Sequence, residues 1–198
     1  MKGSGLVKPG PISVRDAAPD DAPSLLEIWT ENRTERRSDG LAAPRETDVR
    51  SAVARIAADP SERLLLGVVE GEVAGLVHMR RAPITPIHEE EAVHISHLHV
   101  RERHRRRGLG RALVDAAAAW AQEKESEHLL ATSSASARDA NRFLARLGLT
   151  QVAIVRAATV PAIRMKLAGE HVARSADQIV AARRSLRRRR RGTGTATV

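Results

Sequence analysis

Apolar residues recur along the chain with two different periods, and stretches of the two kinds alternate. An apolar residue at every second position, or a short run rich in β-branched residues, is typical of a strand, whereas a stripe with a period near 3.6 is typical of a helix. The pattern predicts strands at residues 12–17, 63–70, 72–81, 92–100, 128–134, 150–158 and 160–168. It predicts helices at residues 20–37, 47–59, 109–126, 137–148 and 175–186.

Turn and cap residues support this order of elements. Glu70-Gly71 separates two strand patterns and predicts a tight hairpin. Thr47 or Asp48 is suited to cap the second helix, and Gly148 is suited to end the fourth. Because strands alternate with helices while the middle strands follow one another as a meander, the fold class is α/β with a mixed rather than a purely parallel sheet.

The composition fits one folded domain and excludes several kinds of chemistry. The chain has 198 residues, of which 42% are hydrophobic, enough for a core. It contains no Cys, which excludes disulfides, thiolate nucleophiles and cysteine metal sites, and no Tyr, which excludes a phenol as a catalytic group. No apolar run approaches the roughly 18 residues of a membrane span, and the first residues lack the apolar core of a signal peptide. We expect a cytoplasmic protein without a membrane partner.

The net charge of +9 is concentrated at one end of the chain. Residues 171–198 contain eight Arg and one Asp, so +7 belongs to this segment and +2 to the first 170 residues. We expect a flexible leader at residues 1–11, a folded domain at 12–167, and a C-terminal helix with an Arg-rich, disordered tail at 168–198. Such a tail is suited to weak contact with nucleic acid or an acidic partner, without indicating which one.

A second basic run, Arg101 to Arg111, contains the sequence RRRGLGR and falls between a predicted strand and a predicted helix. Amides at a helix N-terminus bind anions, and glycines let the backbone approach a phosphate closely. The spacing of Gly108 and Gly110 differs from that of a nucleoside-triphosphate loop and of a dinucleotide fingerprint. A nucleic-acid surface would need stacking aromatics, but the sequence has only Trp29, Trp120 and Phe143, all on apolar helix faces. An anion cradle and a solvated arginine turn remain as alternatives.

The same stretch carries a resemblance to a known family. Arg105-Arg106-Arg107-Gly108-Leu109-Gly110 resembles the Arg/Gln-x-x-Gly-x-Gly/Ala signature of the GNAT-type N-acetyltransferases, and it follows a strand that ends in Leu98-His99-Val100. Residues 137–149, ARDANRFLARLGL, resemble the helix that follows the family's fifth strand. The resemblance covers residues 12–167. It implies a GNAT fold with a mostly antiparallel, splayed sheet of six to seven strands flanked by about four helices.

The resemblance also implies acetyl-CoA as the co-substrate, with no metal. In relatives the loop amides hold the diphosphate, the strand end pairs through its backbone with the pantetheine arm, and two residues of the later helix lie along the other side of the cofactor. The positions in this chain are Leu98, His99, Val100, Arg105, Arg106, Arg107, Gly108, Leu109, Gly110, Arg111, Asn141 and Phe143. Pairs of such domains are common, which suggests a homodimer.

Acetyl transfer to an amine needs a base for the ammonium proton. The strand at 92–100 offers His94, Ser96 and His97. A period of two predicts that His94, Ser96 and Leu98 share one face and that His97 and His99 share the other. Some relatives carry a base six residues before the strand-ending valine, at the position of His94, which makes it the first candidate, with Ser96 as a relay and His97 as the second candidate. A structural histidine is the alternative, and His97 with His99 provides too few ligands for a metal site.

The acid that protonates the leaving thiolate is less evident. The family's usual acid is a Tyr at the position that Leu144 occupies here. Water, the acceptor's own proton, Ser134 and Ser136 are the remaining proton donors. We therefore expect an N-acetyltransferase that acts on a primary amine of a small molecule or protein by direct attack in a ternary complex. The alternative is a non-enzymatic acyl-CoA sensor or a nucleic-acid-associated regulatory module.

Overall fold

A computed structural model describes residues 11–35, 44–87, 89–134, 136–154 and 156–168; side chains are described for the same ranges, except those of residues 32–35. The chain divides into two units, Met1–Thr150 and Gln151–Val198. The expected leader, the helix at 175–186 and the Arg-rich tail lie outside the described residues, apart from residue 11 of the leader and residue 168 of the C-terminal segment. No helix in the described ranges is long and apolar enough to cross a membrane.

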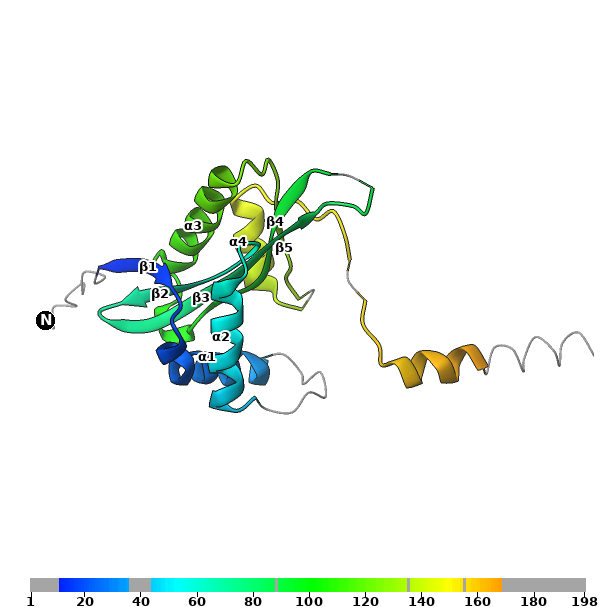
Figure 1. The fold of residues 1–198 in the computed structure, drawn as a ribbon, viewed down its shortest axis with the longest axis horizontal. Coiled ribbons are helices and arrows are strands. Elements are labelled where there is room, and N and C mark those ends of the chain that lie inside the picture. Colours follow the sequence, from blue (N-terminus) through cyan, green and yellow to red (C-terminus); the bar gives the residue numbers. More distant parts are fainter. Residues whose placement is uncertain (1–10, 36–43, 88, 135, 155, 169–198) are drawn as a thin grey trace, which may run out of the picture. The chain divides into compact units, whose positions relative to one another are not determined.

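Five strands formed by described residues of the first unit make one sheet, in the order in which they occur along the chain (Figure 1). All neighbouring strands are antiparallel except the last pair, which is parallel, so the expected mixed, mostly antiparallel sheet is confirmed. The Glu70-Gly71 hairpin is also confirmed, since both residues have positive φ and Val69 pairs with Glu72. The strands are β1 (Ile12–Asp16), β2 (Glu62–Val69), β3 (Glu72–Pro83), β4 (Glu91–Val100) and β5 (Leu129–Ala131).

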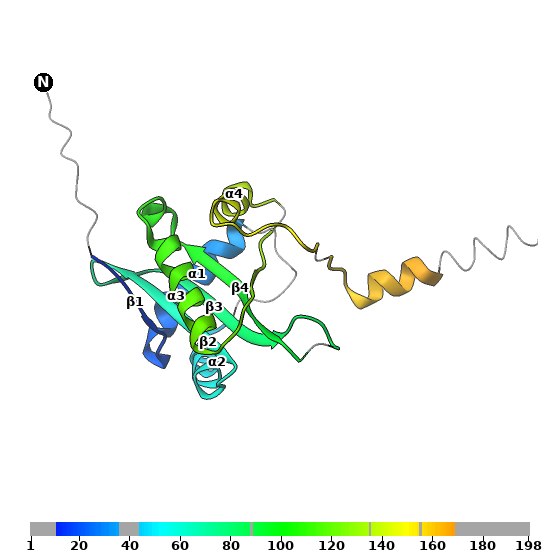
Figure 2. The same cartoon turned by 90° about the horizontal axis from the view of Figure 1, so that it is seen from above.

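Helices in the described part of the first unit cover the sheet on both faces. Helix α3 lies on one face and α1 and α2 on the other (Figures 1 and 2), and apolar side chains of these helices pack against the strands. Gly148, at φ +91°, ends α4 as expected. Asp48 lies in the first turn of α2 and accepts a hydrogen bond from Arg45 N rather than preceding the helix as its cap. The helices are α1 (Ala22–Glu35), α2 (Glu46–Ala58), α3 (Leu109–Glu123) and α4 (Arg138–Arg146), with single 3-10 turns at Pro19–Asp21 (η1) and Glu102–His104 (η2).

Two apolar clusters hold these layers together, one on each face of the sheet. The cluster beneath α3 is the larger, and the helix contributes to it a stripe whose spacing is that of the sequence pattern. The α3 cluster contains Leu65, Val69, Ala74, Val77, Met79, Val93, Ile95, Leu109, Leu113, Ala117, Trp120 and Ala121. The cluster under α1 and α2 contains Leu25, Ile28, Val53, Leu66, Val73 and Leu76.

The beginning of α3 lies unusually close to the sheet because two strand positions lack a side chain. A Cβ added to Gly67 would lie 2.5 Å from Leu109 Cδ1, and one added to Gly75 would lie 2.7 Å from the carbonyl oxygen of His99. Leu109 is fully buried in the space that the two glycines leave. The start of α3 is therefore fixed against β2, β3 and β4.

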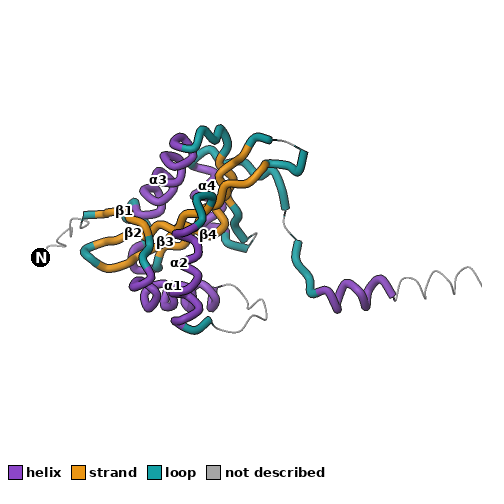
Figure 3. The backbone as a smooth tube through the Cα atoms, in the orientation of Figure 1, coloured by secondary structure: helices purple, strands orange, loops and turns teal. Residues whose placement is uncertain are grey.

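The prediction of strands at residues 150–158 and 160–168 is wrong for the part of these segments that the structure describes. Residues 150–154 and 156–159 have no regular secondary structure, and residues 160–168 form a helix (Figure 3). Thr159 begins this helix, since its carbonyl and hydroxyl oxygens accept hydrogen bonds from Ile163 N and Ala162 N. The apolar positions 163, 165 and 167 suggested a strand, but a Thr cap followed by Pro161 in the first turn is a helix start. The described residues thus form five strands rather than six or seven.

Candidate functional site

The turn between β4 and α3 presents backbone amides at a helix N-terminus. Gly108 precedes α3 in a left-handed conformation, with φ +93°, and Arg106 also has a positive φ of +62°. The first helical hydrogen bond of this end is donated by Ala112 N to Gly108 O at 3.1 Å. The amides of residues 109–111 therefore belong to the first turn, where helix geometry supplies no carbonyl acceptor. Such amides, together with the helix dipole, favour an anion.

The arginine side chains of this turn lie in two different environments. Arg105 Nε donates a hydrogen bond to Val100 O at 3.0 Å, so its side chain folds back on the end of β4. The side chains of Arg106, Arg107 and Arg111 are exposed around the start of α3. The turn therefore combines backbone donors with three cationic side chains that are accessible to solvent.

Beyond Ile95, no described strand pairs with β4 on the side of β5, and residues 96–100 thus form an open edge next to this turn. Its parallel ladder with β5 covers only residues 93–95 and ends where Thr132 N donates to Ile95 O. Arg101 N donates to Ala74 O on the β3 side, and alternation along an antiparallel strand directs the backbone groups of Leu98 and Val100 away from β3. The hydrogen bond from Arg105 to Val100 O agrees with that direction. Backbone donors and acceptors of β4 thus continue toward the turn at residues 105–110, which we call the anion-binding turn after the charge that its amides favour.

α4 brings two of the predicted site residues to this region. A Cβ added to Gly110 would lie 3.4 Å from Phe143 Cζ, so the aromatic ring covers the first turn of α3. Asn141 accepts a hydrogen bond from Ser133 Oγ at 2.5 Å and donates one to Ser134 O at 2.9 Å. Phe143 therefore lies beside the glycines of the turn, while the Asn141 amide holds the segment that follows β5.

The predicted division of β4 into two faces is wrong for His94 and Leu98, which lie on opposite faces because the strand contains a bulge, whereas His97 and His99 share a face as predicted. His78 pairs with His97 while the next residue, Met79, pairs with Ile95, which leaves Ser96 as an extra residue. One additional residue shifts the alternation by one position. Leu98 and Val100 accordingly pack with the α3 cluster.

The same shift gathers the histidines of β4 on the α1 and α2 face of the sheet. His97 and His99 pair with His78 and Leu76, and Leu76 belongs to the α1 and α2 cluster. His94 pairs with Arg80, which shares the face of His78 two residues before it. His94 Nε2 lies 3.3 Å from Ala82 O, and His99 is buried.

Sequence reasoning missed two polar residues on this face. His78 Nδ1 lies 2.6 Å from Ser96 Oγ, and His78 Nε2 lies 3.3 Å from Glu62 Oε2. Ser96 Oγ also lies 3.3 Å from His97 Nδ1. The signal in the sequence was a single His in the otherwise apolar run VAGLVHM, opposite a strand with three further histidines.

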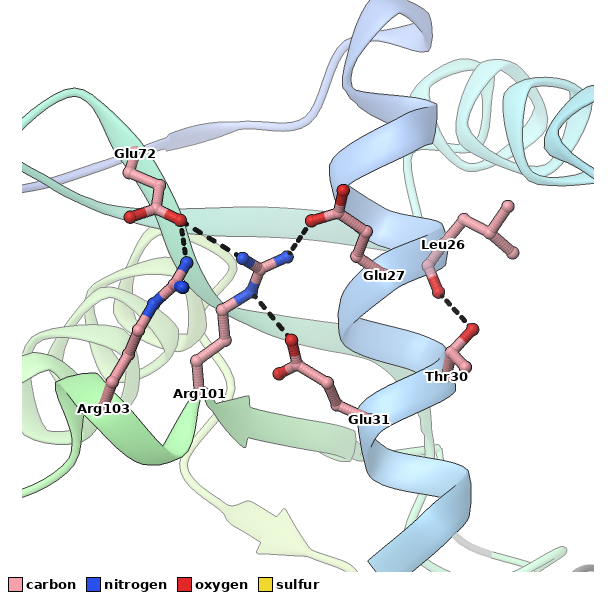
Figure 4. Close-up of a pocket in the computed structure, with 7 residues that line it drawn as sticks. All are labelled: Leu26, Glu27, Thr30, Glu31, Glu72, Arg101 and Arg103. Carbon is pink, nitrogen blue, oxygen red and sulfur yellow. Dashed lines mark hydrogen bonds and ion pairs between the residues drawn. The ribbon is translucent and has the colours of Figure 1, made fainter.

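An open cavity of about 630 Å³ lies between α1 and the end of β4 (Figure 4). The side chain of Arg101 is 5% exposed, and its guanidinium lies 2.6 Å from Glu27, 3.2 Å from Glu72 and 3.7 Å from Glu31. Arg103 also pairs with Glu72. Because Arg101 immediately follows β4, this network ties α1 to the strand that enters the anion-binding turn.

The residues proposed for protonating a leaving group lie after β5. Ser134 and Ser136 are joined by a hydrogen bond of 2.8 Å between their hydroxyls. Leu144 is 8% exposed and belongs to the packed side of α4. Within the described ranges, no group of three His, Asp or Glu side chains is arranged to hold a metal ion.

Known structures share this architecture at low sequence identity. A transcriptional regulator from Bacillus halodurans C-125 superposes with a TM-score of 0.64 at 19% identity, covering 75% of this chain and 99% of its own. An aminoglycoside N-acetyltransferase in complex with CoA gives 0.61 at 13% identity, covering 78% and 97%. A ribosomal-protein-alanine N-acetyltransferase from Brucella melitensis biovar Abortus 2308 gives 0.56 at 17% identity, covering 76% and 98%. These similarities establish the fold.

Family membership rests on the sequence itself. No curated protein matches the chain with significance. The sequence model of the acetyltransferase (GNAT) family matches residues 22–149, which include α1, the bulged strand β4, the anion-binding turn and α4. The match spans more than half of the 198 residues, and the fold and the geometry of the turn agree with it. The chain therefore belongs to the GNAT acetyltransferase family.

Proposed function

We propose that this protein transfers the acetyl group of acetyl-CoA to a primary amine. The observation that carries the proposal is the continuity of the open edge of β4 with the amides at the start of α3. An extended pantetheine arm matches an open strand edge, because both are linear and carry amide groups. The diphosphate matches the helix N-terminus, because amides and exposed arginines favour negative charge there.

The bulge at Ser96 lies where the open edge of β4 begins, which supports a proton-transfer role for the polar side chains beside it. Attack on the thioester forms a bond from the amine nitrogen to the carbonyl carbon and breaks the bond from that carbon to sulfur. The nitrogen loses a proton in this step, and the thiolate gains one. His94 and His97 are the candidate bases, and the contact of His97 with Ser96 favours His97.

The leaving thiolate has no phenol to protonate it. Ser134 and Ser136, water, or the proton removed from the acceptor remain as the source. Leu144 at the usual Tyr position is also the observation that favours a second function, an acyl-CoA-binding module that does not turn over. The two functions differ in a single measurable property, the release of CoA in the presence of an amine.

The acceptor that we propose is a primary amine, and the rest of the acceptor molecule is not specified. Relatives of the same fold are named as acting on aminoglycosides and on a ribosomal-protein alanine. In this chain Trp29 is 39% exposed, and its ring centroid lies 5.0 Å from that of His97. An exposed indole beside the candidate base is suited to hold an ammonium group through cation–π attraction.

The test is thiol release from acetyl-CoA against a panel of benzylamine, spermidine, kanamycin and a peptide with an N-terminal alanine. We expect at least one amine to raise the release of CoA above the rate of hydrolysis and to gain an acetyl group by mass spectrometry. A protein that binds CoA but acetylates none of these amines would support the non-enzymatic function instead.

A further inference from the structure

Four polar side chains from three strands form a hydrogen-bonded chain on the α1 and α2 face of the sheet. Its members, in order, are Glu62 on β2, His78 on β3, and Ser96 and His97 on β4. The three contacts measure 3.3 Å from Glu62 to His78, 2.6 Å from His78 to Ser96, and 3.3 Å from Ser96 to His97. All three lie within hydrogen-bonding distance, so the chain is continuous from a carboxylate to the bulge of β4.

One choice of tautomers satisfies every contact in a single direction. His97 donates from Nδ1 to Ser96 Oγ, the Ser96 hydroxyl donates to His78 Nδ1, and His78 donates from Nε2 to Glu62. A more distant acceptor for Ser96, the carbonyl oxygen of His78, lies at 3.4 Å. In this arrangement Nε2 of His97 carries no proton.

Two cationic side chains lie at the Glu62 end of the chain. Arg55 from α2 lies 3.3 Å from Glu62 Oε2, and Arg80 from β3 lies 4.0 Å from Oε1. The Glu62 side chain is only 10% exposed, so it meets these cations in a partly desolvated position. At the other end, His97 packs against the exposed ring of Trp29.

We propose that Glu62, His78, Ser96 and His97 form a proton relay that removes the acceptor's ammonium proton. The proposal rests on the acetyl transfer proposed above and names residues that this reaction would use. His97 contacts the acceptor as the catalytic base. Ser96, His78 and Glu62 act through it as positioning residues.

The proposed proton transfer from the acceptor to His78 needs no further reactant. An N–H bond of the ammonium breaks as His97 Nε2 gains that proton, and Nδ1 of His97 passes its own proton to Ser96 Oγ. The former hydroxyl proton of Ser96 moves to His78 Nδ1. The net result is a neutral amine and an imidazolium at His78, next to the Glu62 carboxylate that stabilises it. His78 is 21% exposed, so water can collect the proton afterwards.

The geometry distinguishes this relay from ordinary packing of histidines. His78 uses both ring nitrogens within the chain, whereas the His94 contact ends on a backbone carbonyl. The hydroxyl that links the two imidazoles belongs to the bulge residue, which an uninterrupted strand would not place between them. A carboxylate, an imidazole and a hydroxyl in series are the groups that proteins use to move a proton from a hydroxyl.

The test compares Ser96→Ala, His78→Gln and Glu62→Gln with the wild-type protein, using acetyl-CoA and the most active amine of the panel. We expect Ser96→Ala and His78→Gln to lower kcat near neutral pH by about 100-fold, the lower end of what general base catalysis contributes. The KM for acetyl-CoA should not change. The loss should shrink as the pH rises above the pKa of the acceptor amine, because the free amine needs no relay.

Two controls separate a relay from a structural role. Ser96→Thr keeps the hydroxyl and should restore most of the rate, and His128→Gln replaces an exposed histidine outside the chain. Thermal stabilisation by CoA checks that each variant is folded. A wild-type rate in Ser96→Ala, or a loss that is equal at every pH, would overturn the relay alone. A wild-type protein that binds CoA and acetylates no amine would overturn the proposed function and the relay with it.

Discussion

Gly108 is the residue at which the backbone of the anion-binding turn is most constrained. Its φ of +93° is strained for any residue with a Cβ, although the space is open, since an added Cβ would meet Ile12 Cδ1 at an ordinary 3.7 Å. We expect Gly108→Ala to destabilise the protein by about 1–2 kcal/mol and, because the turn must shift, to weaken CoA binding by about tenfold. Chemical denaturation and titration calorimetry measure the two effects.

Gly148 provides a matched control for that substitution. It has nearly the same φ, +91°, and an added Cβ would meet nothing within 4 Å, but it ends α4 rather than beginning α3. Gly148→Ala should therefore cost similar stability and leave the affinity for CoA unchanged. Equal losses of affinity in both variants would show that the turn has no special part in binding.

Single residues also mark the limit of what the sequence could predict about the site. The position of Gly108 between a strand and a helix follows from local pattern, so the turn between β4 and α3 was predictable. The sharing of one face by His94, Ser96 and His97 was not, because it depends on a bulge that arises from pairing with β3. His78 and Glu62 were missed for a related reason, since their contacts join strands that are distant in sequence.

At the scale of elements, β1 is joined to the start of α1 by an ion pair. Asp21 receives two hydrogen bonds from Arg15, at 2.6 and 2.7 Å, and one from Ala18 N at 2.8 Å. The hydrogen bonds from the Arg15 guanidinium are the main reason that the pKa of Asp21 lies below its ordinary value. The carboxylate therefore favours the folded state as long as it is ionised.

Because of this ion pair, we expect the free energy of unfolding to fall as the pH is lowered. Because the pKa of Asp21 is lower in the folded state, its contribution is present above the unfolded pKa of about 3.9 and is lost as the pH falls through the folded value. We expect Asp21→Asn to lower the free energy of unfolding by about 1 kcal/mol at neutral pH and by less in strong acid. Urea denaturation at several pH values measures the difference.

The neighbouring carboxylate serves as the control for the ion pair. Asp20 is 96% exposed and pairs with Arg50 on the surface, so Asp20→Asn should change stability little. A deficit in Asp21→Asn that stays constant down to strong acid would contradict the role of its charge.

The elements themselves were predictable where one pattern was long and unambiguous. The stripe of α3 and the alternating strands of the meander gave the correct element types, since tertiary contacts and local preference agree there. The apolar positions of residues 160–168 fit the period of a strand as well as that of a helix. The hydrogen bond that caps the segment at Thr159 stabilises the helix. The short β5 could not be delimited from sequence, because its length is set by where its ladder with β4 ends.

At the scale of the whole molecule, the first unit contains both apolar clusters, the anion-binding turn and the hydrogen-bonded chain. The sheet separates the face that α3 covers from the face that carries the histidines. The open edge of β4 is where these two faces meet, so a thioester bound along that edge would lie near the bulge. This arrangement is the physical basis for assigning one reaction to residues from β2, β3, β4 and α3.

The most direct test of the account is a calorimetric titration of the wild-type protein with CoA. We expect one saturable site per chain that acetyl-CoA also occupies, with an apparent affinity that weakens as salt screens the arginines around the turn. CoA should also raise the melting temperature by mass action. The absence of both heat and thermal stabilisation at millimolar CoA would contradict the assignment of the turn and, with it, the proposed function.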